Sequence, residues 1–292
     1  MHSVPPTRST PQHRFAIVLG SGGVRSIAAL GMMEVLVHVG LQPDLVVGCS
    51  AGAMFGALIA AGDDAEAAVR IATTLWSAEV TKKRRWRAIA QTLWPRLGRF
   101  DADLALRDDR LVMQRLQQAF GDVQIESLPL ALRVTTTDSA TGERVVLRSG
   151  SLVQALRASI ALPFMFTLVH IGGWRLIDGF VADPLPVSAA ADAQAVLALG
   201  FQSPMPHRVD GPSRLLAQVT SALTNNLMQA RLAEAGAGGT RLLSLVPQPE
   251  RRVGLFDTDA MPYLVNAGRR ATETVLPAIH ALLRRRPERV AA

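Results

Sequence analysis

The sequence has little of several features that define whole classes of protein. It contains one cysteine, Cys49, so no internal disulfide framework can form, and this is typical of a chain in the reducing cytoplasm. No Cys/His spacing resembles a zinc site, so we expect no metal. No uninterrupted apolar run approaches the roughly 20 residues of a membrane-spanning helix. These shortages exclude a disulfide-rich module and a transmembrane protein.

Lysine is also scarce, because only two of the 31 basic residues are lysines. The net charge of +7 therefore reflects arginine, which indicates either anionic partners or a biased genome composition. No basic helix-turn-helix, RNP-like strand or zinc finger is present, so we expect no nucleic-acid partner. The basic stretch at 82–87 (KKRRWR) leaves two interpretations open: a solvated helix face, or a patch that associates peripherally with a membrane.

Strand-like and helix-like segments alternate from the start of the ordered sequence. A β-branched apolar run at 15–19 ends in consecutive glycines, and a helix is predicted from about Ser26, as its cap, to Val39. A second strand, Leu45–Cys49, leads into an apolar helix, Ala51–Ala61. Such a βαβα unit implies parallel strands that end at the same edge of the sheet, so the two glycine-bearing turns become neighbours.

The rest of the chain continues this alternation without a repeat or a Pro/Gly/Ser-rich linker. We therefore predict one α/β domain over residues 14–286, with a central, mostly parallel sheet flanked by helices, between a flexible tail at 1–13 and a C-terminal tail at 287–292. Helices fill much of 64–125. Further strands are predicted at 130–138, 143–148, 174–177, 195–199 and 241–246, and helices at 151–158, 214–235 and 262–285, the last interrupted at Pro277.

A Gly-x-Ser-x-Gly motif, Gly48-Cys49-Ser50-Ala51-Gly52, lies between the second strand and its helix. Small flanking residues permit a sharp strand-to-helix turn that exposes the serine hydroxyl, which makes Ser50 a candidate nucleophile. The helix N-terminus favours negative charge developing nearby. The alternative interpretation is a glycine-rich structural turn.

The first glycine-rich loop, Gly20-Ser21-Gly22-Gly23-Val24-Arg25, can supply hydrogen-bond donors for an oxyanion. Consecutive glycines allow backbone N–H groups to face the space in front of Ser50 without obstruction by side chains. The alternative is a nucleotide-phosphate loop. Neither G-x-G-x-x-G nor a Walker pattern is present, which disfavours that alternative.

A serine nucleophile also needs a proton acceptor. Of the six histidines, only His170 and His207 lie outside the predicted tail and helices, and the order Ser50, Asp178, His207 is formally admissible for an α/β-hydrolase triad. The position of the serine argues against that fold, because only one strand precedes the elbow here.

Five segments of the chain together resemble one known family. In chain order they are Gly20-Ser21-Gly22-Gly23-Val24-Arg25-Ser26 with Gly31, Gly48–Gly52, Thr137–Glu143, Ala158–Phe164 and Asp178-Gly179. In order and approximate spacing they are similar to the patatin-like phospholipases, also called lipid acyl hydrolases. The resemblance covers about residues 15–187 and implies a three-layer α/β sandwich that uses a Ser-Asp dyad.

The resemblance assigns a role to each matching residue. It implies Ser50 as nucleophile and Asp178 as base, with an oxyanion hole formed by the amides of Gly22, Gly23 and Val24. Supporting positions are Gly20, Arg25, Gly48, Gly52 and Gly179. A carboxylate, with an unperturbed pKa near ~3.9, is a weaker base than imidazole, so Asp178 must be tightly positioned and partly desolvated.

The chain departs from the family pattern at two positions. Ser26 stands where the family usually has glycine, and Phe180 replaces a glycine after Asp-Gly. For Arg25, holding the loop through its guanidinium fork is favoured over meeting a lipid phosphate. The other candidate groups are expected to be structural: Asp138 and Asp183 as turn residues, His170 and Cys49 as packed side chains.

The expected function is that of a cofactor-independent serine esterase that cleaves acyl esters of lipids or phospholipids through an acyl-enzyme. Its expected place is the cytoplasm, with a peripheral membrane association if the 82–87 stretch binds lipid. Two alternatives stay open: a non-catalytic lipid- or anion-binding scaffold, supported by Ser26 and the basic stretch, and a Ser-His-Asp esterase. No pattern in the sequence specifies an oligomeric state.

Overall fold

The computed structural model describes residues 12–77, 79, 109–206, 208–247, 251, 253–254 and 257–284. The basic stretch at 82–87, His207, residues 1–11 of the first tail and the whole C-terminal tail lie outside these residues. The first strand begins at His13, one residue before the predicted start of the domain at residue 14.

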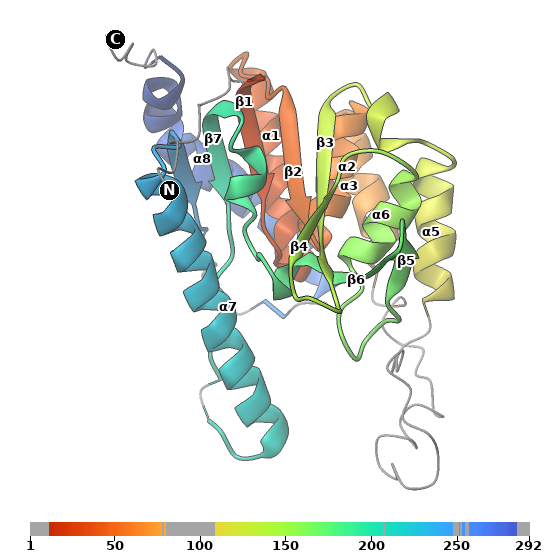
Figure 1. The fold of residues 1–292 in the computed structure, drawn as a ribbon. Coiled ribbons are helices and arrows are strands. Elements are labelled where there is room, and N and C mark those ends of the chain that lie inside the picture. The colour runs from red at the N-terminus through yellow and green to blue at the C-terminus, as the bar shows by residue number, and fades with distance from the viewer. Residues whose placement is uncertain are drawn as a thin grey trace, which may run out of the picture.

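The described strands form one sheet in the order β5-β6-β3-β2-β1-β7-β8, with β4 paired to β3 (Figure 1). Their bounds are β1 His13–Leu19, β2 Leu45–Cys49, β3 Ala131–Asp138, β4 Arg144–Leu147, β5 Val169–Ile171, β6 Trp174–Asp178, β7 Ala193–Leu199 and β8 Leu242–Leu245. Five neighbouring strands of the sheet, β3, β2, β1, β7 and β8, run parallel to one another. Strands β4 and β6 pair antiparallel with β3, and β5 pairs antiparallel with β6. The predicted mostly parallel sheet is confirmed.

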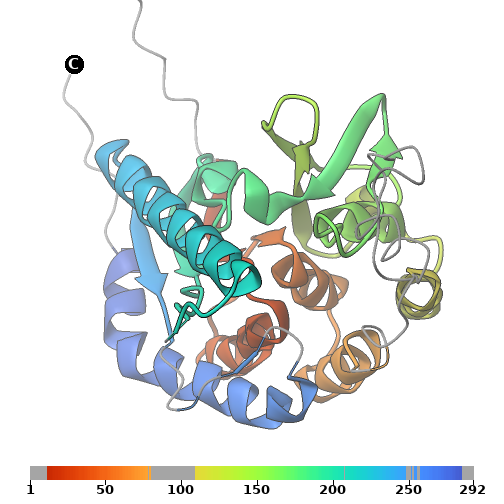
Figure 2. The same ribbon diagram turned by 90° about the horizontal axis from the view of Figure 1, so that it is seen from below.

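Helices cover both faces of this sheet. Their bounds are α1 Ala28–His38, α2 Ala51–Ala61, α3 Ala65–Leu75, α5 Arg110–Phe120, α6 Leu152–Ser159, α7 Pro212–Ala237 and α8 Met261–Arg284. Seen from below, α1, α2, α3 and α8 lie on one side of the sheet and α7 on the other (Figure 2). Short 3-10 helices span Gly23–Ile27, Ile125–Ser127, Gly179–Val181, Val187–Ala190 and Thr258–Ala260.

The central strand β1 divides the core into two layers. Phe15, Ile17 and Leu19 face the larger cluster with α1, α2 and α8, while Ala16 and Val18 face a smaller cluster that includes Met228 of α7. This alternation follows from the two-residue period of a strand that is buried on both faces. The three-layer α/β fold is therefore confirmed. No helix within the described ranges is long and apolar enough to cross a membrane.

Two local expectations are wrong, and one strand is not predicted. Ser26 does not cap a helix: residues 23–27 form a 3-10 turn, α1 begins at Ala28, and the Ser26 hydroxyl instead donates to the Gly20 carbonyl at 3.1 Å. The sequence does not predict β5, which is only three residues long. Helix α8 continues through Pro277, because the proline lies on the exposed side, where water can satisfy the carbonyl that loses its N–H partner.

Candidate active site

The turn between β2 and α2 holds Ser50 in an unusual backbone conformation. Its φ is 56° and its ψ is −130°, which non-glycine residues rarely adopt. Neighbouring glycines make this turn possible, because a Cβ on Gly52 would lie 2.5 Å from the Leu19 carbonyl oxygen and one on Gly48 would collide with the backbone of Ala53. The Gly-x-Ser-x-Gly motif thus forms the strained elbow that the sequence predicts.

A buried serine from another element supports this elbow. The hydroxyl of Ser159, at the end of α6, accepts a hydrogen bond from the Ser50 amide at 2.8 Å and donates one to the Thr135 carbonyl at 2.8 Å. Ser159 is fully buried, so both hydrogen bonds are shielded from water. This contact fixes the elbow to β3. Ser159 lies in the family-like segment Ala158–Phe164, but that resemblance assigns it no role.

Asp178 ends β6 and lies directly beside the elbow. Strand β6 pairs antiparallel with β3, with Asp178 opposite Thr136, and β3 pairs with β2, which leads into Ser50. This register brings Asp178 Oδ2 within 2.7 Å of Ser50 Oγ, which donates to it. The other carboxylate oxygen, Oδ1, accepts from the Phe180 amide at 3.0 Å. The two residues, separated by 128 positions, therefore share one hydrogen bond in a fixed orientation.

The environment of Asp178 changes its acidity. Burial raises the pKa of Asp178 from 3.8 to about 7, and the hydrogen bonds from Phe180 and Ser50 oppose this rise only in part. A carboxyl group with a pKa near 7 is a much better proton acceptor at neutral pH than an exposed one. The following residue must be glycine, since a Cβ on Gly179 would lie 2.5 Å from the Thr135 carbonyl oxygen.

The first glycine-rich loop lies against the same cavity. Gly22 and Gly23 line it together with Ser50 and Asp178, and Gly23 has a φ of +57°. The Val24 side chain is buried away from the cavity, in the core. A Cβ on Gly22 would meet the ring of Phe201 at 2.6 Å, so the loop packs closely at this point. The backbone of residues 22–23 is thus exposed to the space in front of the serine hydroxyl.

Arg25 ties this loop to the rest of the protein. Its Nε donates to the Gly22 carbonyl at 3.1 Å and its Nη1 to the Gln202 carbonyl at 2.6 Å, while the guanidinium lies 5.9 Å from the centre of the Phe201 ring. These are the contacts expected of a loop-holding arginine. Burial lowers the pKa of Arg25.

The cavity in front of Ser50 has a volume of about 230 Å³ and walls that are mostly apolar. Its apolar side chains come from the segment after α6, from the end of α3 and from the 3-10 turn after β6. The lining residues include Trp76, Ile160, Leu162, Phe166 and Phe180, with the polar Ser203, Thr220 and Thr224 on one side. Thr220 and Thr224 belong to α7, a helix for which the sequence gives no functional signal.

Four other candidate groups do not line this cavity. His170 is exposed on β5, so the expectation of a packed side chain is wrong; a three-residue edge strand leaves one of its faces in solvent. Asp183 is not an ordinary turn residue, because it is fully buried and accepts from Arg144 at 2.6 Å. Asp138 does cap its turn, accepting from Ala140 and Thr141. Cys49 is buried, as expected, and burial raises the pKa of its thiol.

No histidine in the described part of the chain lines the cavity. The residues covered by the structure also contain no cluster of three or more His, Cys, Asp and Glu side chains that could hold a metal ion. The groups that meet at the cavity are therefore a serine hydroxyl, a buried carboxyl group and the backbone of a glycine-rich loop, which is the set needed for nucleophilic attack on a carbonyl.

Comparison with known proteins gives one consistent family. An uncharacterized NTE family protein of Mycobacterium tuberculosis is 32% identical over 192 residues, which is 66% of this chain and 49% of that protein. Patatin-like phospholipase domain-containing protein 7 of Rattus norvegicus is 30% identical over 64% of this chain and 14% of its own length. The chain spans about half the length or less of these curated relatives.

Among solved structures, VipD from Legionella pneumophila matches 92% of this chain and 67% of its own, with 14% identity and a TM-score of 0.48. The model of the family described as patatin-like phospholipase matches residues 17–191, which is more than half of the chain and includes Ser50, Asp178 and the glycine-rich loop. The chain therefore belongs to the patatin-like phospholipase family.

Proposed function

We propose that the protein is a serine hydrolase that cleaves the acyl esters of lipids with a Ser50-Asp178 dyad. The observation that carries this proposal is the 2.7 Å hydrogen bond from Ser50 Oγ to a buried Asp178 carboxylate, at a strained elbow facing an apolar cavity. Family membership supports a lipid ester as substrate, and the apolar walls suit an acyl chain.

The first half of the reaction forms an acyl-enzyme. As Ser50 Oγ attacks the ester carbonyl carbon, its proton passes to Asp178 Oδ2 along the existing hydrogen bond. The carbonyl oxygen becomes an oxyanion, and the backbone amides at Gly22, Gly23 and Val24 are the proposed donors that stabilise it. The intermediate then collapses: the carbon–oxygen bond to the alcohol breaks, and the alcohol leaves with the proton from Asp178.

The second half regenerates the enzyme with the same groups. Water replaces the alcohol, gives one proton to Asp178 and attacks the acyl carbon. Collapse of the second tetrahedral intermediate breaks its bond to Ser50 Oγ, returns the proton to that oxygen and releases the fatty acid. The raised pKa of Asp178 suits both directions, because a group that titrates near 7 both accepts and donates a proton at neutral pH.

Two substitutions test the dyad directly. Ser50→Ala and Asp178→Asn should each lower kcat/KM for a dissolved p-nitrophenyl ester by at least about a thousandfold, because each removes a group that takes part in both half-reactions. Ser127→Ala and Asp122→Asn are matched controls, since both side chains are exposed and lie away from the cavity. Substantial activity in either purified dyad variant would remove that residue from the mechanism.

A fluorophosphonate probe separates this function from a non-catalytic lipid- or anion-binding scaffold. Labelling requires an activated serine, so the probe should attach to Ser50 in the wild-type protein, at a much lower rate in Asp178→Asn, and not at all at this position in Ser50→Ala. Peptide mapping by mass spectrometry identifies the labelled residue. An unlabelled wild-type protein would favour the scaffold.

A further inference from the structure

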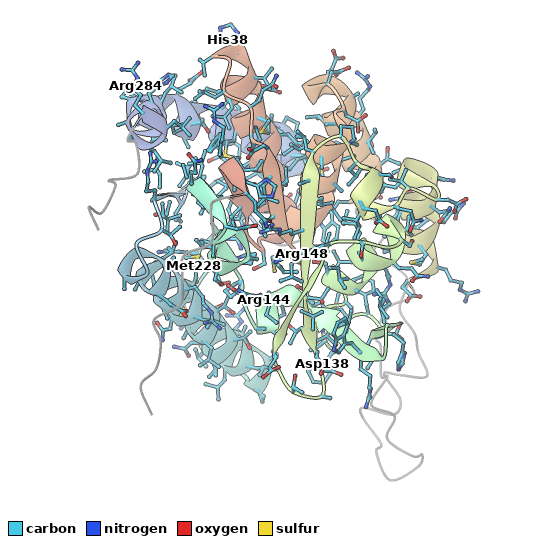
Figure 3. All side chains as sticks on the ribbon, turned by 45° about the horizontal axis from the view of Figure 1, so that its top comes forward. His38, Asp138, Arg144, Arg148, Met228 and Arg284 are labelled. Atoms are coloured by element: carbon cyan, nitrogen blue, oxygen red, sulfur yellow. The ribbon has the colours of Figure 1, made fainter. Side chains whose placement is uncertain are left out.

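Helix α7 extends past the carboxyl-terminal ends of β1 and β2, where the candidate site lies (Figure 1). Its second half is attached to the body of the protein: Met228 and Ala235 are buried, and Arg231 Nε lies 4.0 Å from the buried carboxylate of Asp183. Figure 3 labels Met228 on this part of the helix and Arg144, the other partner of Asp183, on β4. The first half of α7 has no buried residue.

The first half of α7 presents an apolar face to solvent. Leu216 and Leu223 are 64% and 65% exposed, and Leu215 and Val219 are also exposed. Spacings of four residues between 215, 219 and 223 place these side chains on one stripe of the helix. From residue 215 to residue 230 the sequence contains no Asp, Glu, Lys or Arg. A solvated surface helix normally carries charge on its exposed side, so this face is unusual.

This apolar face adjoins residues that line the cavity. Thr220 and Thr224 line the cavity from the same half of α7, each one residue beyond an exposed apolar side chain. Exposed apolar residues also stand next to lining residues on three other segments. These are Phe164, between Leu162 and Phe166; Val181, after Phe180; and Met205, two residues after Ser203.

Hydrogen bonds join α7 to residues 203 and 204, and the neighbouring Gln202 is bonded to the candidate oxyanion loop. Asn225 accepts from the Ser203 amide at 2.7 Å and donates to its carbonyl at 3.0 Å, and Ser221 donates to the Pro204 carbonyl at 3.0 Å. The preceding residue, Gln202, accepts from Arg25 of the glycine-rich loop. The exposed face of α7 is thus held in a fixed position relative to Ser50.

We infer that the apolar face of α7, defined as Leu215, Leu216, Val219 and Leu223, enters the surface of aggregated lipid and seats the cavity mouth on it. This inference rests on the proposed function for the identity of the partner. A lipid surface fits because four separate chain segments carry exposed apolar side chains beside residues that line one apolar cavity, and a lipid ester must leave such a surface to reach Ser50. Burial of these side chains in acyl chains supplies the driving force.

Flotation with phosphatidylcholine vesicles tests the inference. All proteins carry Ser50→Ala, so that the vesicles stay intact. Adding Leu216→Gln and Leu223→Gln should weaken vesicle binding by at least about tenfold, because two exposed leucines lose their apolar contact with the lipid. The matched control carries Val37→Gln and Val123→Gln, two exposed valines that lie away from the cavity, and should bind as the parent does.

Two further measurements keep the result specific. In proteins with Ser50 intact, the leucine variant should lower the ratio of vesicle-ester to dissolved-ester hydrolysis by at least about tenfold. A tryptophan introduced as Leu223→Trp should shift its emission to the blue when vesicles are added. Equal flotation of the leucine variant and its parent would overturn the inference. Vesicle binding that requires anionic lipid and disappears at high salt would also overturn the inference. The same holds if the leucine variant changes from dimer to monomer but still binds vesicles.

Failure of this inference and failure of the proposed function give different results. If the wild-type protein does not hydrolyse a dissolved ester, the proposed function is wrong, whatever the flotation result. If it hydrolyses the dissolved ester but the leucine variant floats like its parent, only the role of α7 is wrong.

Discussion

Helices α2 and α7 share a sequence property but differ in their surroundings. Neither α2 nor residues 215–230 of α7 contains a charged residue. Ten of the eleven residues of α2 are buried, whereas only Met228 and Ala235 are buried among the 26 residues of α7. An uncharged helix thus packs into the core at one side of the site and lies against solvent at the other. The difference is that α2 is enclosed by the core, whereas the first half of α7 leaves apolar side chains in solvent.

The rigid side is required by the strain at Ser50. A serine at a φ of 56° persists only where its neighbours allow no alternative. The close contacts of Gly48 and Gly52 and the hydrogen bond from the Ser50 amide to Ser159 provide that constraint. Helix α7, in contrast, contributes two threonines to the wall of the cavity, but the hydrogen bonds of Ser50 and Asp178 described above involve no residue of this helix.

The largest effect is expected from a methyl group on the rigid side. Gly52→Ala should destabilise the protein by about 3 kcal/mol or more, because the added Cβ would overlap the backbone of β1 and its turn. The elbow would also move, so hydrolysis of a dissolved ester should be lost. Denaturant unfolding and the ester assay measure the two effects. A Gly52→Ala protein with wild-type stability and rate would show that α2 can move away from β1 at little cost.

The next effect is the dependence of the reaction on pH. Because the pKa of Asp178 is raised to about 7, the carboxyl group is protonated below that value and cannot accept the Ser50 proton. The value of kcat/KM for a dissolved ester should therefore be constant above pH 7 and fall about tenfold per unit below it. A profile that stays flat down to pH 5 would mean that Asp178 ionises in the free enzyme as an exposed aspartate does.

The same shift predicts an opposite trend for stability. Between its ordinary pKa of 3.8 and its raised value of about 7, Asp178 holds its proton in the native state but loses it in the unfolded chain. The free energy of unfolding should then fall as the pH rises through this window, by about 1.4 kcal/mol per unit from this group. The Asp178→Asn variant has no group that titrates at this position. Denaturant unfolding of the wild-type protein and this variant from pH 4 to 8 therefore measures the contribution of Asp178, as the difference between their free energies of unfolding.

The contrast between the two helices also explains what the sequence can predict. The bounds of β2 and α2 follow from the residues alone, since a β-branched run, a glycine-flanked serine and an apolar helix each have one favourable local structure. The convergence of Ser50 and Asp178 needs more than local preference. It depends on β6 pairing antiparallel with β3, which no sequence pattern predicts. The family resemblance implies the dyad but not the strand pairing that forms it.

Two parts of the site lie beyond any local pattern. Ser159 supports the elbow through a contact between residues 109 positions apart, which no residue spacing encodes. The role of α7 depends on which side of the helix faces the cavity, and its uncharged run is equally compatible with a buried helix. Periodicity specifies an element and its faces, but the tertiary arrangement decides which face stays in solvent.

The smallest effect is expected on α7 itself. Gly236 lies near the end of this helix, has a negative φ, and a Cβ there would have no neighbour within 4 Å. Gly236→Ala should therefore stabilise the protein by about 0.5 kcal/mol, because alanine loses less conformational entropy than glycine when a helix forms. Thermal and denaturant unfolding measure the change. This added stability appears in the global unfolding transition only if α7 unfolds together with the core, to which Met228 and Ala235 attach it. An unchanged midpoint would show that α7 detaches before the core unfolds, and that the rigid side of the site does not depend on the helix.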